Sequence, residues 1–132
     1  MSKFFSPDEA NALLPLLREE LQQLQELTRQ YEERYMDLQD RKANHSGAIE
    51  RSDDLFFAEE LQLDFMRLEI RAAVRGFELK GVYLKMIDPG LIDFPARVGD
   101  KDVLLCWKQG EPSVSHYHGW EDGFIGRKPL QD

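Results

Sequence analysis

The segment that decides the fold lies in the last third of the chain. Residues 87–127 read IDPGLIDFPARVGDKDVLLCWKQGEPSVSHYHGWEDGFIGR. Short apolar runs alternate here with turns that contain Gly and Pro, which is typical of short β-strands with tight connections. The runs predict strands at 82–87, 91–98, 103–108 and 114–118. We therefore expect a small antiparallel sheet, in which Pro95 marks an edge or a bulge.

The sequence before this segment predicts two long helices. Ser6-Pro7-Asp8-Glu9 is a helix start with a capping box, and apolar residues then recur at spacings of three and four as far as Leu38. The first helix is expected to run from Pro7 to about Ala43, and the second to start at Ser52. The second helix carries two apolar stripes. One stripe consists of Ala58, Leu61, Phe65, Leu68 and Ala72, and the other of Leu63, Met66, Ile70, Val74 and Phe77.

Two apolar stripes on one helix indicate two packing partners. One partner should be the first helix, folded back as an antiparallel hairpin, and the other the sheet or a second subunit. The predicted fold is α+β, a single domain over 1–132 with a helical hairpin at 6–80 and a sheet module at 81–132. We expect the second helix to cover one face of the sheet. We also expect a homodimer through the helices, because the longer first helix would leave part of its apolar seam exposed, at Tyr31–Leu38 or Leu14–Leu21, unless the sheet covers it.

Composition excludes several classes of function. The chain of 132 residues has 17 Lys and Arg against 25 Asp and Glu, a net charge of -8, and neither part of it is basic. This balance argues against nucleic-acid binding, which requires a basic face. No segment approaches the run of about 18 apolar residues that a membrane span requires. The single cysteine and the absence of an apolar leader favour a cytoplasmic protein.

The polar residues between the strands are the candidates for a site. Glu111 is held between Gly110 and Pro112, so its carboxylate has a fixed direction and can serve as a base or pair with Arg127. Asp93 lies between two apolar residues and would need a partner if buried. We expect these groups to converge on one concavity, because an unpaired buried charge is costly. The expected ligand-binding residues are Arg127, His118, Glu111, Trp107 and Asp93.

A divalent metal is a second hypothesis for the same segment. His116 and His118 occupy alternate positions of a strand, so both imidazoles should point to one face, where Glu111, Asp93 or Cys106 can supply a third ligand. A surface pair of histidines bonded to water or carboxylate is the commoner explanation of this spacing. For Cys106 a buried, inert thiol is favoured over a Cys-His nucleophile, and for Trp107 packing in the core.

Several motifs resemble the bacterial DUF2203 family of uncharacterised proteins. The similar segments are FSPDEANALLPLLREEL, GVYLKMIDPGLIDFPA, LLCWKQGEP, HYHG and GFIGRKPL, which together cover nearly the whole chain. The resemblance implies a small bacterial protein of the cytoplasm. It also implies that His118, but not His116, is a motif residue. The full set of motif positions implied is Asp93, Phe94, Pro95, Cys106, Trp107, Gly110, Glu111, His118 and Arg127.

Three functions compete on this evidence. The first is a binding module that recognises a small anionic ligand or a partner chain through the sheet. The second is a structural or oligomerisation protein whose polar cluster is an internal ion-pair network. The third is a hydrolase that uses Glu111 and His118 as acid and base, with Asp93 as a further catalytic candidate and with or without a divalent metal. The enzyme ranks last, because the chain has no HExxH, GxSxG, P-loop or GxGxxG motif.

Overall fold

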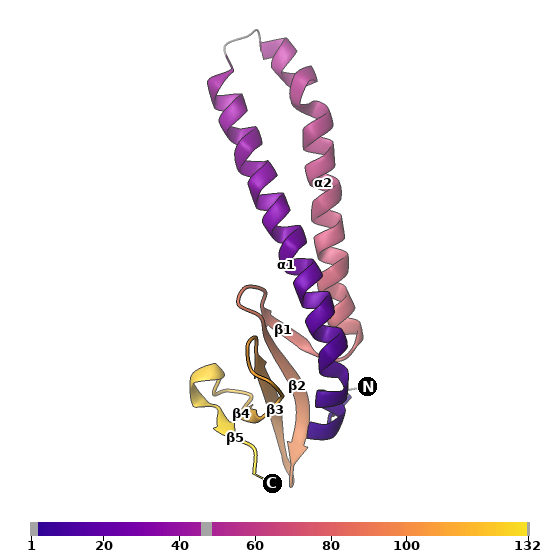
Figure 1. Ribbon diagram of the computed structural model, residues 1–132, viewed down its shortest axis with the longest axis vertical. Coiled ribbons are helices and arrows are strands. Elements are labelled where there is room, and N and C mark those ends of the chain that lie inside the picture. The colour runs from indigo at the N-terminus through magenta and orange to yellow at the C-terminus, as the bar shows by residue number, and fades with distance from the viewer. Residues whose placement is uncertain (1–2, 46–48, 132) are drawn as a thin grey trace.

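A computed structural model describes residues 3–45 and 49–131. Two long antiparallel helices form a hairpin, and a five-stranded sheet lies at the end that holds the start of the first helix and the end of the second (Figure 1). The predicted α+β fold is confirmed. The elements are α1 (Pro7–Asn44), α2 (Ile49–Leu79), β1 (Tyr83–Met86), β2 (Leu91–Val98), β3 (Lys101–Lys108), β4 (His116–Gly119), the 3-10 helix η1 (Phe124–Gly126) and β5 (Lys128–Pro129).

The start of α1 follows from local chemistry, whereas the start of α2 does not. At the start of α1 the Ser6 side chain accepts a hydrogen bond from the Glu9 amide at 3.1 Å, and the Glu9 carboxylate accepts one from the Ser6 amide at 2.9 Å. This is the predicted capping box. The predicted start of α2 at Ser52 is wrong, because α2 begins at Ile49. Ser52 is followed in the sequence by Asp53 and Asp54, which suit the start of a helix. Acidic residues are favourable throughout the first turn, so these two residues do not fix the first residue of α2.

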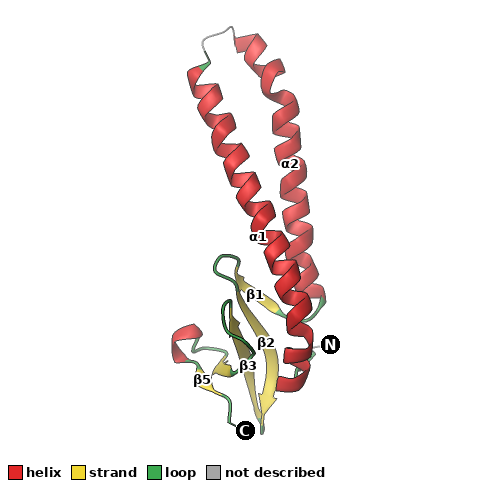
Figure 2. Cartoon of the chain, viewed as in Figure 1, coloured by secondary structure: helices red, strands yellow, loops and turns green. Residues whose placement is uncertain are grey.

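The sheet is a simple antiparallel meander in the order β1-β2-β3-β4-β5. Figure 2 shows β2 and β3 as its long central strands. In the register of the sheet, Asp93 is directly opposite Cys106, and Leu104 is opposite His118. The predicted limits of β2 are confirmed, whereas β5 and η1 were not predicted, because segments of two and three residues have no periodicity to detect.

The helix that covers the sheet is α1, not α2 as the sequence suggested. One face of the first half of α1 is buried against β2 and β3, with a smaller contribution from the end of α2 through Phe77. Gly90, in the turn before β2, lies so close to Leu21 that a Cβ atom there would collide with it. The buried residues of α1 in this main core are Ala10, Leu14, Leu17, Leu21 and Leu24, and those of the sheet are Ile92, Phe94, Ala96, Val103, Leu105 and Trp107.

The upper part of the hairpin has a second, smaller core, which contains Leu38, Phe56, Leu63 and Met66. Of the α1 seam that was expected to be exposed, Leu14–Leu21 is covered by the sheet and Leu38 is buried in this second core, whereas Tyr35 is 46% exposed. The apolar stripe of α2 that includes Met66 faces α1, while the stripe that includes Phe65 is exposed. Within the described ranges, no helix is both long enough and apolar enough to cross a membrane.

Candidate functional site

The two faces of the sheet carry different side chains. Ile92, Phe94 and Trp107 point to the helices and belong to the main core. Side chains alternate along a strand, so Asp93 and Cys106 point to the opposite face. His118 lies on that face too, on the next strand. These three residues therefore come from three adjacent strands, β2, β3 and β4, and the register of the sheet brings them together.

Asp93, Cys106 and His118 form a buried cluster of potential metal ligands. One donor atom from each residue lies within 4.8 Å of the others. The exposed fractions of the three residues are 2%, 0% and 4%. Burial of a carboxylate, a thiol and an imidazole in one place is costly unless each has a partner. The cluster is therefore the strongest chemical feature in the part of the chain that the structure describes.

The contacts of His118 define which atoms carry protons. Its Nδ1 atom lies 2.8 Å from the carbonyl oxygen of Gly119, and a carbonyl can only accept, so Nδ1 carries a proton. Its Nε2 atom lies 3.2 Å from Oδ2 of Asp93. In a neutral ring with the proton on Nδ1, Nε2 has a lone pair directed at a carboxylate oxygen. Two acceptors so close require a positive charge between them, either a proton or a metal ion.

Two further features of the cluster concern the Asp93 carboxylate and the Cys106 thiol. The second carboxylate oxygen of Asp93, Oδ1, is buried and has no hydrogen-bond partner among the described residues. Burial raises the pKa of the Cys106 thiol to about 12, and the Asp93 carboxylate acts in the same direction. Without a bound cation, Cys106 is thus a neutral thiol at physiological pH, as the sequence favoured.

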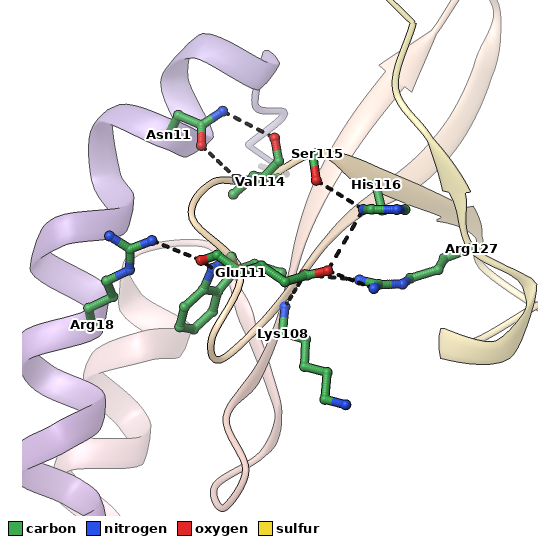
Figure 3. A network of polar contacts seen from close by, with 9 residues as sticks. Asn11, Arg18, Lys108, Glu111, Val114, Ser115, His116 and Arg127 are labelled. Atoms are coloured by element: carbon green, nitrogen blue, oxygen red, sulfur yellow. Dashed lines mark hydrogen bonds and ion pairs between the residues drawn. The ribbon is translucent and has the colours of Figure 1, made fainter.

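Glu111 and Arg127 form a second pair beside this cluster. The guanidinium of Arg127 donates two hydrogen bonds to the Glu111 carboxylate, at 3.0 and 2.6 Å. Glu111 also accepts a hydrogen bond from the amide of Lys108 at 2.8 Å (Figure 3). The hydrogen bonds from Arg127 hold the pKa of Glu111 below its usual range, and Glu111 raises the pKa of Arg127. Both side chains are mostly buried, so this is a strong, charge-assisted pair.

His116 belongs to the Glu111 pair and not to the buried cluster. Its Nδ1 atom lies 3.0 Å from the Ser115 hydroxyl and 3.9 Å from the Glu111 carboxylate. In Figure 3 its ring points toward Glu111 and Arg127. The two histidines thus have different partners. His118 lies beside Asp93 and Cys106, whereas His116 lies beside Ser115 and Glu111. Trp107 lies on the other face of the sheet, although its indole N–H donates to the Glu111 carbonyl at 3.0 Å.

Three polar residues of α1 hold the loops of this module in place, and the sequence analysis missed them. Asn11 exchanges two hydrogen bonds with the backbone of Val114, at 2.7 and 3.2 Å. Arg18 donates to the carbonyls of Glu111 and Pro112. Gln25 bonds to Ile87 and to Gln109. These residues are seven positions apart, so they form a polar stripe beside the leucine seam of α1. This regular spacing is the sequence signal by which they could have been found.

The fold and the site together define a class of protein: a helical hairpin that carries a small antiparallel sheet with a buried Asp-Cys-His cluster. The family model for an uncharacterized conserved protein, DUF2203, matches residues 3–130. The chain belongs to this family. Searches of curated proteins and of solved structures gave no match.

Proposed function

We propose that this protein is a binding module for a divalent transition-metal ion of the zinc class. The ligands would be the Asp93 carboxylate, the Cys106 sulfur and Nε2 of His118. The observation that carries the proposal is the contact between His118 Nε2 and Asp93 Oδ2, two acceptors 3.2 Å apart in a buried place. A cation bound by these two atoms and by the Cys106 sulfur would give all three groups a partner at once.

The chemistry of the donors selects the metal. A set of one sulfur, one nitrogen and one oxygen suits Zn²⁺ and similar ions, while Mg²⁺ and Ca²⁺ prefer oxygen ligands alone. In a tetrahedral zinc site the ligand atoms are roughly 3.3–3.8 Å apart, given bonds of about 2.0–2.3 Å. The present spread of up to 4.8 Å is close to this, so small side-chain rotations would complete the site. The hydrogen bond from Nδ1 to Gly119 is the outer contact that commonly orients a ligating histidine.

The geometry favours a cation over the small anionic ligand that the sequence suggested. Arg127 is the basic residue expected to bind an anion, but its Nη1 and Nη2 atoms both donate to Glu111. An anion would have to displace a carboxylate from a mostly buried pair. Glu111 is also a poor general base, because Arg127 lowers its pKa. Both points weaken the hydrolase hypothesis that used Glu111 and His118.

A structural role is the second candidate, and the same contact supports it. A second proton on His118 would turn the acceptor pair into a buried ion pair with Asp93, next to the Glu111–Arg127 pair. The cluster would then stabilise the sheet without any metal. The two candidates make opposite predictions about metal affinity, so one experiment separates them.

The test is Co²⁺ titration of chelator-treated protein, followed by absorption spectroscopy. Ligation by Cys106 should produce a thiolate-to-cobalt charge-transfer band, and tetrahedral geometry should produce intense visible bands. Cys106→Ala should remove the charge-transfer band, and Asp93→Asn or His118→Gln should weaken binding by at least about tenfold. His116→Gln is the matched control and should bind normally. If wild type and Cys106→Ala give the same spectrum, the metal site is wrong and the structural role takes its place.

A further inference from the structure

The outer face of α2 carries an apolar stripe that no described part of the chain covers. We call Ala58, Leu61, Phe65, Leu68 and Ala72 the α2 stripe. Leu61, Phe65 and Leu68 are 58%, 66% and 60% exposed, and both alanines are exposed as well. The spacings of three and four residues align these side chains along one straight seam, as in a two-stranded coiled coil. An exposed apolar seam of this length usually marks an interface.

The α2 stripe is not needed to build the monomer. Leu63, Met66 and Phe77 on the opposite side of α2 are buried in the two cores. The sheet packs against α1, and Figure 1 shows it on the α1 side of the hairpin. α2 thus already packs against α1 and, through Phe77, against the main core. The α2 stripe faces away from both.

We propose that the α2 stripe is the interface of a homodimer in which two α2 helices pack antiparallel. The charges beside the seam identify a second copy as the partner. Asp64 and Arg71 are exposed on the same edge of the stripe, seven residues apart. When Phe65 is placed opposite the partner's Leu68, Asp64 faces the partner's Arg71. Two-fold symmetry repeats this contact, so the interface gains two attractive pairs.

Other arrangements of the same two helices bring like charges together. A shift of one heptad in one direction places Arg71 opposite the partner's Arg71, and Asp64 opposite the partner's Glu78. A shift in the other direction places Asp64 opposite the partner's Asp64. In parallel packing Asp64 meets the partner's Glu69. Like charges at these positions destabilise a helix pair, so the flanking residues favour one register.

The antiparallel arrangement also suits the shape of the molecule. The sheet module is attached at the C-terminal end of α2, so antiparallel packing places the two modules at opposite ends of the dimer. No residue of the Asp93–Cys106–His118 cluster belongs to the α2 stripe. Dimer formation is therefore independent of the metal proposal, and either can fail without the other.

Sedimentation equilibrium of the full chain tests the dimer. We expect twice the 15.4 kDa of one chain at micromolar concentration. Leu68→Asp should give the monomer mass, because it places a charge at the centre of the seam. Met36→Asp is the matched control: Met36 is 66% exposed on α1, outside the stripe, and this variant should remain dimeric. A monomeric wild type, or a dimer that Leu68→Asp leaves intact, would overturn the proposal.

Charge exchange tests the register. Asp64→Arg and Arg71→Asp should each raise the dimer Kd by at least about tenfold, because each change creates two like-charge pairs. A mixture of these two variants should form a heterodimer, in which all the pairs are again attractive. The double variant should dimerise like wild type. Circular dichroism verifies that each variant is folded. Single variants with an unchanged Kd, or a mixture that does not associate, would exclude this register.

Discussion

Asp93 and Cys106 lie directly opposite each other in the ladder between β2 and β3. The register of β2 and β3 thus decides whether this carboxylate and this thiol can bind the same metal ion. A slip of one residue would turn Asp93 toward the helices and Phe94 toward the opposite face, so the packing of Phe94 in the main core fixes the site. The buried cluster depends on the same interactions that stabilise the sheet.

Zinc should stabilise the protein if the cluster binds it. At a free concentration of about one hundred times Kd, a ligand that binds only the folded state adds about 2.7 kcal/mol. For a chain of this size the corresponding rise in Tm is roughly 10 °C. Differential scanning fluorimetry of chelator-treated protein measures this shift, with Mg²⁺ as the control ion. An equal rise with Asp93→Asn would contradict the assignment of the ligands.

Cys106 should react slowly with alkylating reagents in metal-free, folded protein. The thiol is buried, and its pKa of about 12 compares with about 8.5 for a free cysteine. At pH 8 the thiolate fraction is then lower by roughly three orders of magnitude than in the unfolded chain. Iodoacetamide labelling with and without urea, followed by mass spectrometry, measures the ratio of rates. Equal rates in the two states would show that the thiol is accessible.

The Glu111–Arg127 pair should make stability depend on pH in the acid range. Arg127 lowers the pKa of Glu111 in the folded state. The folded state therefore binds fewer protons, and the contribution of the pair is present above pH of about 4.5 and lost as pH falls through the folded pKa. Glu111→Gln should reduce the free energy of unfolding by about 1–3 kcal/mol at pH 7, and it should flatten the loss below pH of about 4.5.

Urea denaturation at several pH values checks this prediction. Glu121→Gln, at an exposed carboxylate of the same module, is the control and should change stability by less than about 0.5 kcal/mol. A parallel loss in wild type and Glu111→Gln throughout the acid range would show that other carboxylates cause acid unfolding.

The polar stripe of α1 should contribute to the free energy of unfolding through its hydrogen bonds to the sheet module. Gln25 donates to the Ile87 carbonyl at 2.7 Å and exchanges hydrogen bonds with the Gln109 side chain. Gln25→Ala leaves partly buried groups without partners, so we expect a loss of about 1–3 kcal/mol. Gln23→Ala, two residues away and exposed, should cost less than about 0.5 kcal/mol. Similar changes in stability for the two variants in urea denaturation would show that the hydrogen bonds of Gln25 contribute little.

Local sequence signals were enough to predict the main helices and strands of this protein. The heptad spacing of α1, the capping box at Ser6 and the Gly and Pro turns are local signals, and they predicted the helical hairpin and the principal strands. The alternation of side chains along β2 also places Asp93 on the face opposite to Ile92 and Phe94. Local periodicity can be recognised in a sequence, because it depends on residues a few positions apart.

Only the tertiary structure decided which helix covers the sheet and which polar residues meet. Asp93 and His118 are 25 positions apart, and their contact depends on the register of three strands, which packing against α1 fixes. The same packing directs Asn11, Arg18 and Gln25 to the loops of the sheet, and leaves the stripe that includes Phe65 on the outside. Such contacts depend on how complete elements fit together, and a one-residue change of register would alter them all.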